Sequence, residues 1–208
     1  MNWQDLLNPA IQNFIKTHKN ADVKELALKK PPHEDWNYPL ILDQIKAHRK
    51  IGKIPPFDKE GIILPSADLI EQASSWACAQ YKAGLYEGDL FIDLAAGSGA
   101  DTFAFSKKFK RGVAVEKDKI SADILAHNLD VLNTSHITIY NQPAENFVTD
   151  MPKANLVYCD PQRRNTQKRG IYDLSKCSPD IPSLLKVLKA QKVLIKTSPV
   201  LDIHKTVH

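Results

Sequence analysis

The sequence predicts an α/β fold, in which a parallel sheet flanked by helices follows a helical N-terminal segment. Two observations support this prediction. From residue 89 onward, short apolar runs alternate with helical stretches, and such an alternation specifies a parallel sheet with right-handed crossovers. Each run is continuously apolar, which is typical of strands that are covered on both faces.

Residues 1–60 are predicted to form the helical N-terminal segment, and residues 61–208 the α/β core. Apolar residues recur at helical spacing early in the chain, a second amphipathic stretch covers residues 39–50, and proline pairs at 31–32 and 55–56 separate these elements. A third helix is predicted over 66–84 with Ser66 as its N-cap. A basic stripe on the second stretch is consistent with a solvated helix face; it comprises Lys46, Arg49, Lys50 and Lys53.

The core is predicted to contain five strands and three helices. The strands are expected at residues 90–94, 112–116, 137–140, 155–159 and 192–196. The helices are expected at 101–110, 120–133 and 183–189.

Composition places few limits on function. The net charge of +4 permits a nucleic-acid partner without requiring one. The three cysteines form no CxxC pair and the histidines are scattered, so no metal site is predicted. With no apolar run of membrane length and no secretory leader, the expected location is cytoplasmic.

A glycine-containing turn follows the first predicted strand, over residues 93–101. Small residues let the backbone turn tightly and bring N–H groups against a ligand. A dinucleotide turn would carry a third glycine where Thr102 stands. Asp93, at the strand end, would repel a diphosphate and attract a cationic ligand. A tight turn without a ligand is the alternative.

Acids also follow the second and fourth predicted strands. Glu116 lies near the spacing at which such sheets place a ribose-binding carboxylate, although it is equally explained as a solvated acid beside Lys117. Asp160 and Pro161 stand where open α/β sheets bind ligands; the proline fixes the direction of the loop, and the carboxylate could take a substrate proton. Arg163 and Arg164 give a basic loop that favours a nucleic-acid substrate or pairs with local acids.

These residues resemble the class I S-adenosylmethionine-dependent methyltransferases, and more narrowly the bacterial methyltransferases that carry a THUMP-like domain after the catalytic domain. The resemblance covers most of the chain from residue 44 onward. It rests on Gln44-Ile45 with Lys50, Lys53 and Pro55; Glu71-Gln72-Ala73-Ser74-Ser75 with Tyr81-Lys82-Ala83; the glycine turn; Asp160-Pro161-x-Arg163-Arg164; and Lys196-Thr197-Ser198-Pro199-x-Leu201-Asp202-Ile203.

The resemblance implies a Rossmann-like sheet, S-adenosylmethionine as methyl donor and an RNA substrate. It carries cofactor roles onto Asp93, Gly97, Gly99 and Glu116, which match its motifs. The full set of predicted cofactor-binding residues is Asp93, Ala95 (where the first glycine usually stands), Gly97, Gly99, Asp101, Thr102, Glu116, Lys117 and Glu145. Asp160 and Pro161 are the predicted catalytic residues, and Arg163 and Arg164 the predicted substrate-binding residues.

The chain departs from the family pattern in three ways. Gln162 and Arg163 replace the proline and aromatic residue of enzymes that methylate exocyclic amines. Glu145 is a substitute for the acid that many relatives place against the adenine, or else an ordinary acid in the first turn of a helix. Five strands are predicted where the superfamily has seven, so a fragment is expected, with one sheet edge unpaired.

Three functional classes remain open. Direct methyl transfer to a nitrogen or oxygen is preferred to a mechanism with a cysteine nucleophile, because Cys159 should face away from Asp160 into the core. The alternatives are a non-catalytic cofactor- or RNA-binding module and a nicotinamide-dependent oxidoreductase.

Overall fold

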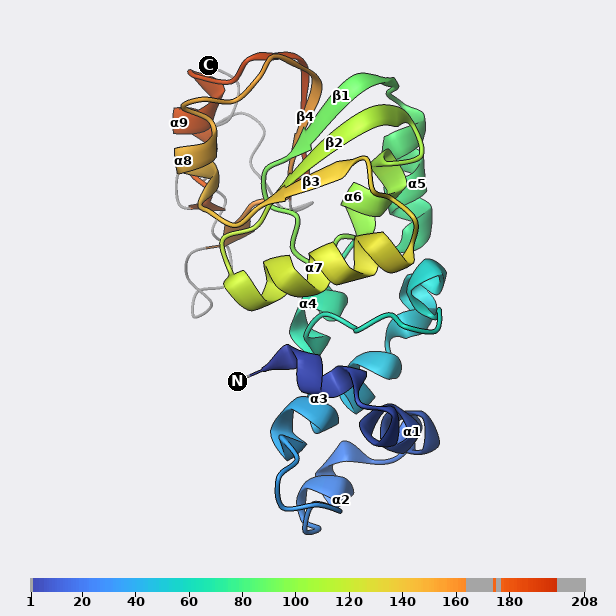
Figure 1. Ribbon diagram of the computed structural model, residues 1–208. Helices are drawn as coiled ribbons and strands as arrows, with labels where there is room; N and C mark the ends of the chain where they lie inside the picture. The colour runs from blue at the N-terminus through green and yellow to red at the C-terminus, as the bar shows by residue number, and fades with distance from the viewer. Residues whose placement is uncertain (1, 164–173, 175–176, 198–208) are drawn as a thin grey trace.

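The computed structural model describes residues 2–163, 174 and 177–197 (Figure 1). Its centre is a five-stranded parallel sheet in the order β3-β2-β1-β4-β7. The strands are β1 (Gly88–Asp93), β2 (Phe109–Val115), β3 (Ile137–Tyr140), β4 (Ala154–Cys159) and β7 (Ala190–Ile195). The predicted parallel α/β architecture is therefore confirmed. The strand order reverses direction between β1 and β4, the position at which open parallel sheets form a ligand-binding crevice.

Both faces of the sheet are covered, as the continuous apolar runs predicted. Leu90 and Ile92 belong to a core cluster with α8 (Ala144–Phe147) and α9 (Ile181–Leu185). Phe91, between them in the chain, belongs to a cluster on the other face, with α5 (Trp76–Gly84) and α6 (Ala100–Phe105). Successive side chains of a strand point to opposite faces, so β1 is buried on both sides (Figure 1).

The helical N-terminal segment packs against α7 (Lys119–Val131). It comprises η1 (Trp3–Leu7), α1 (Pro9–His18), α2 (Val23–Ala27), α3 (Tyr38–His48), η2 (Ile51–Lys53) and η3 (Pro55–Phe57), and α4 (Ala67–Gln72) follows it. Its apolar cluster includes Ile63 and Ile124 of α7. Asn128 of α7 bonds to both the N–H and the C=O of Ile63, at 3.0 and 2.7 Å. These contacts join the segment to the core; the boundary at residue 60 stays a prediction.

The prediction of one continuous helix over residues 66–84 is wrong, because the structure has two helices there, α4 and α5. Ser66 does cap α4, but Ala73 is extended, with ψ 151°, and Ser75 caps α5 by accepting from the N–H of Cys78. Serine side chains compete for backbone hydrogen bonds inside helices and favour caps, which explains a break at Ser74-Ser75. Trp76 then begins α5 and stacks on Phe103, with ring centroids 5.5 Å apart.

Other boundaries also differ from the prediction. The helix predicted over 101–110 ends at Phe105, because Phe109 starts β2 and packs into an aromatic group with Phe91 and Phe105. α9 lies at 181–185 instead of 183–189, since Asp180 caps it and Pro182 occupies its first turn. The strand pair β5 (Gln162–Arg163) and β6 (Cys177–Ser178) was not predicted, and the short helix α8 carries Glu145 in its first turn.

The basic stripe, which runs from α3 into η2, makes contacts that the solvated-face interpretation did not include. Lys46 pairs with Asp68 of α4 at 3.2 Å, and Lys50 pairs with Glu71. Lys53 donates to the Glu71 carbonyl at 2.7 Å. Three cations of the stripe therefore connect α4 to the segment formed by α3 and η2. No helix in the described part of the chain combines the length and the apolar character that crossing a bilayer needs.

Candidate active site

A cleft of about 610 Å³ opens at the carboxyl ends of β1 and β4, with α4 as a further wall. It contains residues from the glycine turn, α6 and β4, and the residue that follows β7. Its lining residues are Asp68, Leu69, Gln72, Ala73, Ser74, Asp93, Ala95, Ala96, Gly97, Ser98, Asp101, Tyr158, Asp160, Pro161, Gln162 and Lys196. The structure thus brings together acids that are far apart in the sequence.

The glycine turn has a backbone that only glycine adopts readily. Gly97 and Gly99 have φ of +51° and +80°, in the left-handed region. A Cβ on Gly99 would lie 2.3 Å from Cδ1 of Leu125 in α7, so this glycine also permits close packing beneath the turn. Gly97 is one of the residues that line the cleft. Gly99 is the N-cap residue of α6 and is not one of them.

Asp93 ends β1 in a nearly closed environment. It is 1% exposed, and its carboxylate accepts from the Thr102 hydroxyl at 2.7 Å and from the Ala95 N–H at 3.2 Å. Burial raises the pKa of Asp93 from 3.8 to about 7, aided by the nearby charge of Asp101 and opposed by the Thr102 hydrogen bond. A cationic ligand in the cleft would favour the ionised form. Thr102, for which a cofactor contact stays a prediction, is fully buried, and its hydroxyl supports Asp93.

A buried polar cluster lies beside Asp93, and sequence reasoning missed three of its four members. Asp101 accepts from the Ser74 hydroxyl at 2.9 Å and from the Tyr158 hydroxyl at 2.8 Å. Lys82 of α5 donates to the same two hydroxyls, at 2.9 and 2.8 Å, and lies 2.6 Å from Asp101 Oδ1. Burial and the neighbouring Asp101 raise the pKa of Tyr158 far above its usual range. Tyr158 could have been predicted, because it lies two residues before Asp160 and shares its face of β4; no local signal pairs Lys82 with Asp101.

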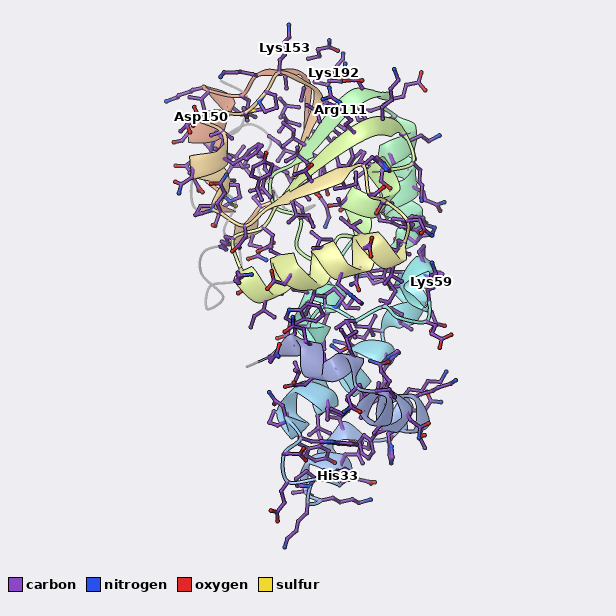
Figure 2. All side chains as sticks on the ribbon, in the orientation of Figure 1. His33, Lys59, Arg111, Asp150, Lys153 and Lys192 are labelled. Carbon is purple, nitrogen blue, oxygen red and sulfur yellow. The ribbon has the colours of Figure 1, made fainter. Side chains whose placement is uncertain are left out.

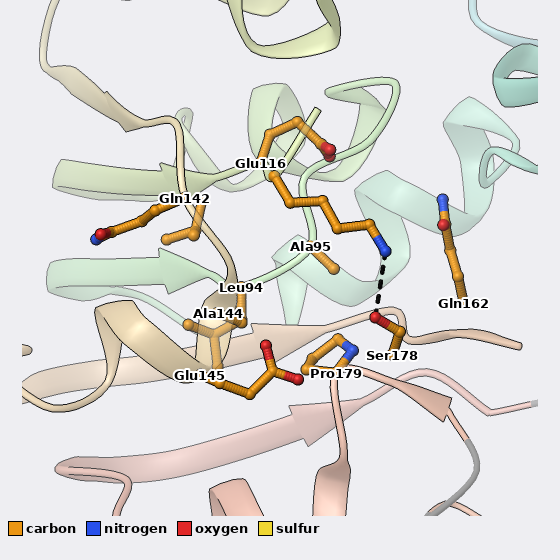
Figure 3. A pocket seen from close by; sticks show the side chains of 11 residues that line it. Leu94, Ala95, Glu116, Gln142, Ala144, Glu145, Gln162, Ser178 and Pro179 are labelled. Carbon is orange, nitrogen blue, oxygen red and sulfur yellow. Dashed lines mark hydrogen bonds between the residues drawn. The ribbon is translucent and has the colours of Figure 1, made fainter. Parts of the chain in front are cut away.

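A smaller cavity of about 30 Å³ adjoins the cleft and shares Ala95 and Gln162 with it. Figure 3 shows Glu116 on one side of this cavity and Glu145 and Pro179 on the opposite side. Glu116 accepts from the N–H groups of Gly97 and Asp118, both at 2.9 Å. The second acid therefore braces the glycine turn as well as lining the cavity.

Two further predicted residues meet at this cavity. Lys117 donates to the Ser178 hydroxyl at 3.2 Å (Figure 3). Glu145, in the first turn of α8, accepts from the N–H of Asp180 at 3.4 Å. Ser178 and Pro179 complete the wall and were not predicted.

Asp160 faces the cleft at the end of β4, next to Pro161. Its Oδ2 lies 2.5 Å from Nζ of Lys196, the residue after β7. Burial raises the pKa of Asp160, and the bond to Lys196 opposes that rise. Cys159 lies in the core, as expected, with 2% of its surface exposed. Burial raises the pKa of its thiol, so the thiolate that a nucleophilic mechanism needs is disfavoured.

The proposed substrate arginines are only partly described. The backbone of Arg163 lies in β5, paired with Cys177 of β6. Arg164 lies outside the described residues. Among the residues that the structure does describe, no group of three histidine, cysteine or acidic side chains is arranged to hold a metal ion.

Four carboxyl groups line the cleft, those of Asp68, Asp93, Asp101 and Asp160. Asp68, Asp101 and Asp160 pair with Lys46, Lys82 and Lys196, so much of their charge is balanced. A ligand with a sulfonium or ammonium group beside Asp93 would favour the ionised form of this buried acid, whereas a diphosphate beside it would oppose that ionisation.

Solved structures define the fold class. The chain matches the structure of a protein from Porphyromonas gingivalis W83, provisionally assigned as a methyltransferase, with TM-score 0.78 and 24% identity over 95% of this chain. The match covers 50% of that protein, so the chain spans half its length. The fold is therefore the Rossmann-like fold of methyltransferases. A precorrin-6y C5,15-methyltransferase from Geobacter metallireducens matches less well, with TM-score 0.46 and 17% identity over 70% of this chain and 71% of that one.

The chain belongs to the family described as conserved hypothetical protein 95, whose model matches residues 52–168. The matched range includes the glycine turn, Glu116 and Asp160. No curated protein matches the chain.

Proposed function

We propose that the protein is an S-adenosylmethionine-dependent methyltransferase that acts on RNA by direct transfer to a nitrogen or oxygen. The observation that carries the proposal is the acid-lined cleft beside a left-handed glycine turn, at the switch point of a parallel sheet. S-adenosylmethionine would supply a methyl group on a positively charged sulfur.

The residues present fit this cofactor. Asp93 and Asp101 would face the cationic amino-acid end of the cofactor. Gly97 has no side chain, so the ligand could approach the backbone of the turn there. Glu116 would accept from the ribose hydroxyls. The smaller cavity, at about 30 Å³, would have to widen between Lys117, Glu145 and Pro179 to admit the base. A nicotinamide dinucleotide fits less well, because its diphosphate would lie against carboxylates.

The acceptor would lie between Asp160 and α4. As the acceptor nitrogen or oxygen bonds to the methyl carbon, the bond from that carbon to sulfur breaks, and Asp160 takes the proton that the acceptor loses. Alignment and exclusion of water supply most of what such a displacement needs. Pro161 directs the chain out of β4, so that the carboxylate stays at the cleft.

The RNA substrate is supported by the sequence around the cleft. Gln162 lines the cleft, and Arg163 and Arg164 follow it directly; arginine pairs well with phosphate. The resemblance to THUMP-like methyltransferases agrees with this choice. If the arginines contact RNA, changing both to alanine should weaken RNA binding and reduce its salt dependence; an unchanged salt slope would contradict the assignment.

Calorimetry and a transfer assay test the proposal. The protein should bind S-adenosylmethionine and S-adenosylhomocysteine but not NAD, and should transfer a tritiated methyl group to total RNA. Binding of NAD in preference to both sulfur compounds would refute the cofactor assignment. Cofactor binding without transfer to RNA, protein or small-molecule pools would instead support a non-catalytic binding module.

A further inference from the structure

The pair formed by Asp160 and Lys196 joins two parts of the chain that lie 36 residues apart. Lys196 follows β7, the strand that pairs with β4, and its N–H donates to the Cys159 carbonyl at 2.9 Å. This backbone bond extends the β4–β7 ladder to the last residue before Asp160. The lysine is therefore held by the sheet itself, directly beside the carboxylate.

Both side chains remain open to the cleft. Each is 33% exposed, and both belong to the residues that line it. Their bond uses one oxygen of the carboxylate, Oδ2, and within the described part of the chain Oδ1 is the oxygen left to receive a proton. An ammonium in contact with a partly buried carboxylate stabilises its charged form.

The other charged groups near Asp160 do not replace this contribution. Asp101 of α6 disfavours the ionised form of Asp160, and Lys82 of α5 favours it. However, Lys82 bonds to Ser74 and Tyr158 and contacts Asp101, so its charge is already matched there. Among the residues that the structure describes, Lys196 is the cation in contact with Asp160 itself.

We propose that Lys196 is a positioning residue, which holds Asp160 ionised and directed into the cleft so that it can take a proton from the methyl acceptor. This inference rests on the proposed function and narrows its substrate class. The acceptor would be a nitrogen or oxygen that carries a proton, such as a ring N–H, an amine or a hydroxyl, because an ionised carboxylate can accept a hydrogen bond from that group and then take its proton.

Carbon-13 NMR of aspartate carboxyl groups tests the positioning role without requiring a substrate. The Asp160 signal is identified as the one lost in Asp160→Asn, and it is followed against pH in the wild type, Lys196→Met, Lys196→Gln and Lys196→Arg. We expect both neutral variants to raise the midpoint of Asp160 by about one pH unit or more, and Lys196→Arg to restore it. An unchanged midpoint in a folded neutral variant would overturn the proposal.

Lys192→Met is the matched control. Lys192 is an exposed lysine on the same strand, roughly 13 Å away along β7 at about 3.3 Å per residue, and Figure 2 shows it at the end of the molecule remote from the N-terminal helices. The Asp160 midpoint should not change in this variant. If it moves as far as in Lys196→Met, the effect belongs to the general charge of β7 and the proposal fails.

A second measurement links the pair to the reaction. In the transfer assay, the acid limb of the pH profile should move to higher pH in Lys196→Met and return in Lys196→Arg. A faster reaction in Lys196→Met would overturn the proposal, because the lysine would then be an obstacle in the cleft. If no acceptor is methylated by any variant, the proposed function fails, while the NMR titration still decides whether Lys196 controls Asp160.

Discussion

The two walls of the cleft are built differently. The wall at the ends of β1 and β2 is tied together by carboxylates that accept from backbone N–H groups: Asp93 accepts from Ala95, and Glu116, at the adjoining cavity, accepts from Gly97 and Asp118. The wall at the ends of β4 and β7 depends on a pair of side chains from segments 36 residues apart, Asp160 and Lys196. We therefore expect substitutions in the second wall to leave the backbone of the glycine turn in place.

The largest effect expected from this contrast is on turnover. Asp160→Asn should lower methyl transfer by about 10²–10⁴-fold, because the amide cannot take the acceptor proton. Cofactor affinity, measured by calorimetry, should change little, since the cofactor would be held by the other wall. The control is Asp150→Asn, which removes an exposed acid that does not line the cleft (Figure 2). Retained turnover in Asp160→Asn would make Asp160 a structural turn residue.

The next effect is on stability and tests how rigid the first wall is. Gly99→Ala should destabilise the protein by about 1–3 kcal/mol, because a Cβ would clash with Leu125 at a left-handed backbone position. Urea unfolding measures the change. Gly52→Ala is the control, as nothing lies within 4 Å of the added Cβ and its φ is not positive. Equal stability of the two variants would show that the turn adapts.

A smaller effect concerns the pH dependence of cofactor binding. The pKa of Asp93 is about 7 in the free protein, and a cationic ligand favours the ionised form. Cofactor affinity should therefore fall as the pH drops below 7, by at most about tenfold per pH unit, and should level off above 7. Asp93→Asn should give weaker binding that varies less with pH. The same pH dependence in Asp93→Asn would assign it to another group.

The stability of the free protein should respond to Asp93 in the opposite direction. The pKa in the folded state lies above the ordinary value of 3.8, so protonation stabilises the fold. This contribution is complete below about pH 4 and is lost as the pH rises through 7. Comparison of unfolding with and without cofactor across this range separates the two effects.

The contrast between the walls also explains what the sequence could predict. The strands and the acids at their ends were accessible, because apolar runs and strand-end carboxylates are local patterns. The division at Ser74-Ser75 was missed because residues 66–84 keep helical apolar spacing across it. No local sequence pattern indicates which residues Lys82 and Lys196 contact. Lys82 meets Asp101, and Lys196 meets Asp160, only because the order of the strands in the sheet brings these segments together.

The position of Trp76 gives the molecule a built-in optical reporter. The indole stacks on Phe103 and stands two residues after Ser74, a cleft-lining residue. Its fluorescence should respond when the cleft fills, whereas Trp3 and Trp36 report on the apolar cluster of the N-terminal segment. The part of the emission that is lost in Trp76→Phe would identify the signal of Trp76. Its change in a stopped-flow experiment would then report the rate of ligand binding without a dye.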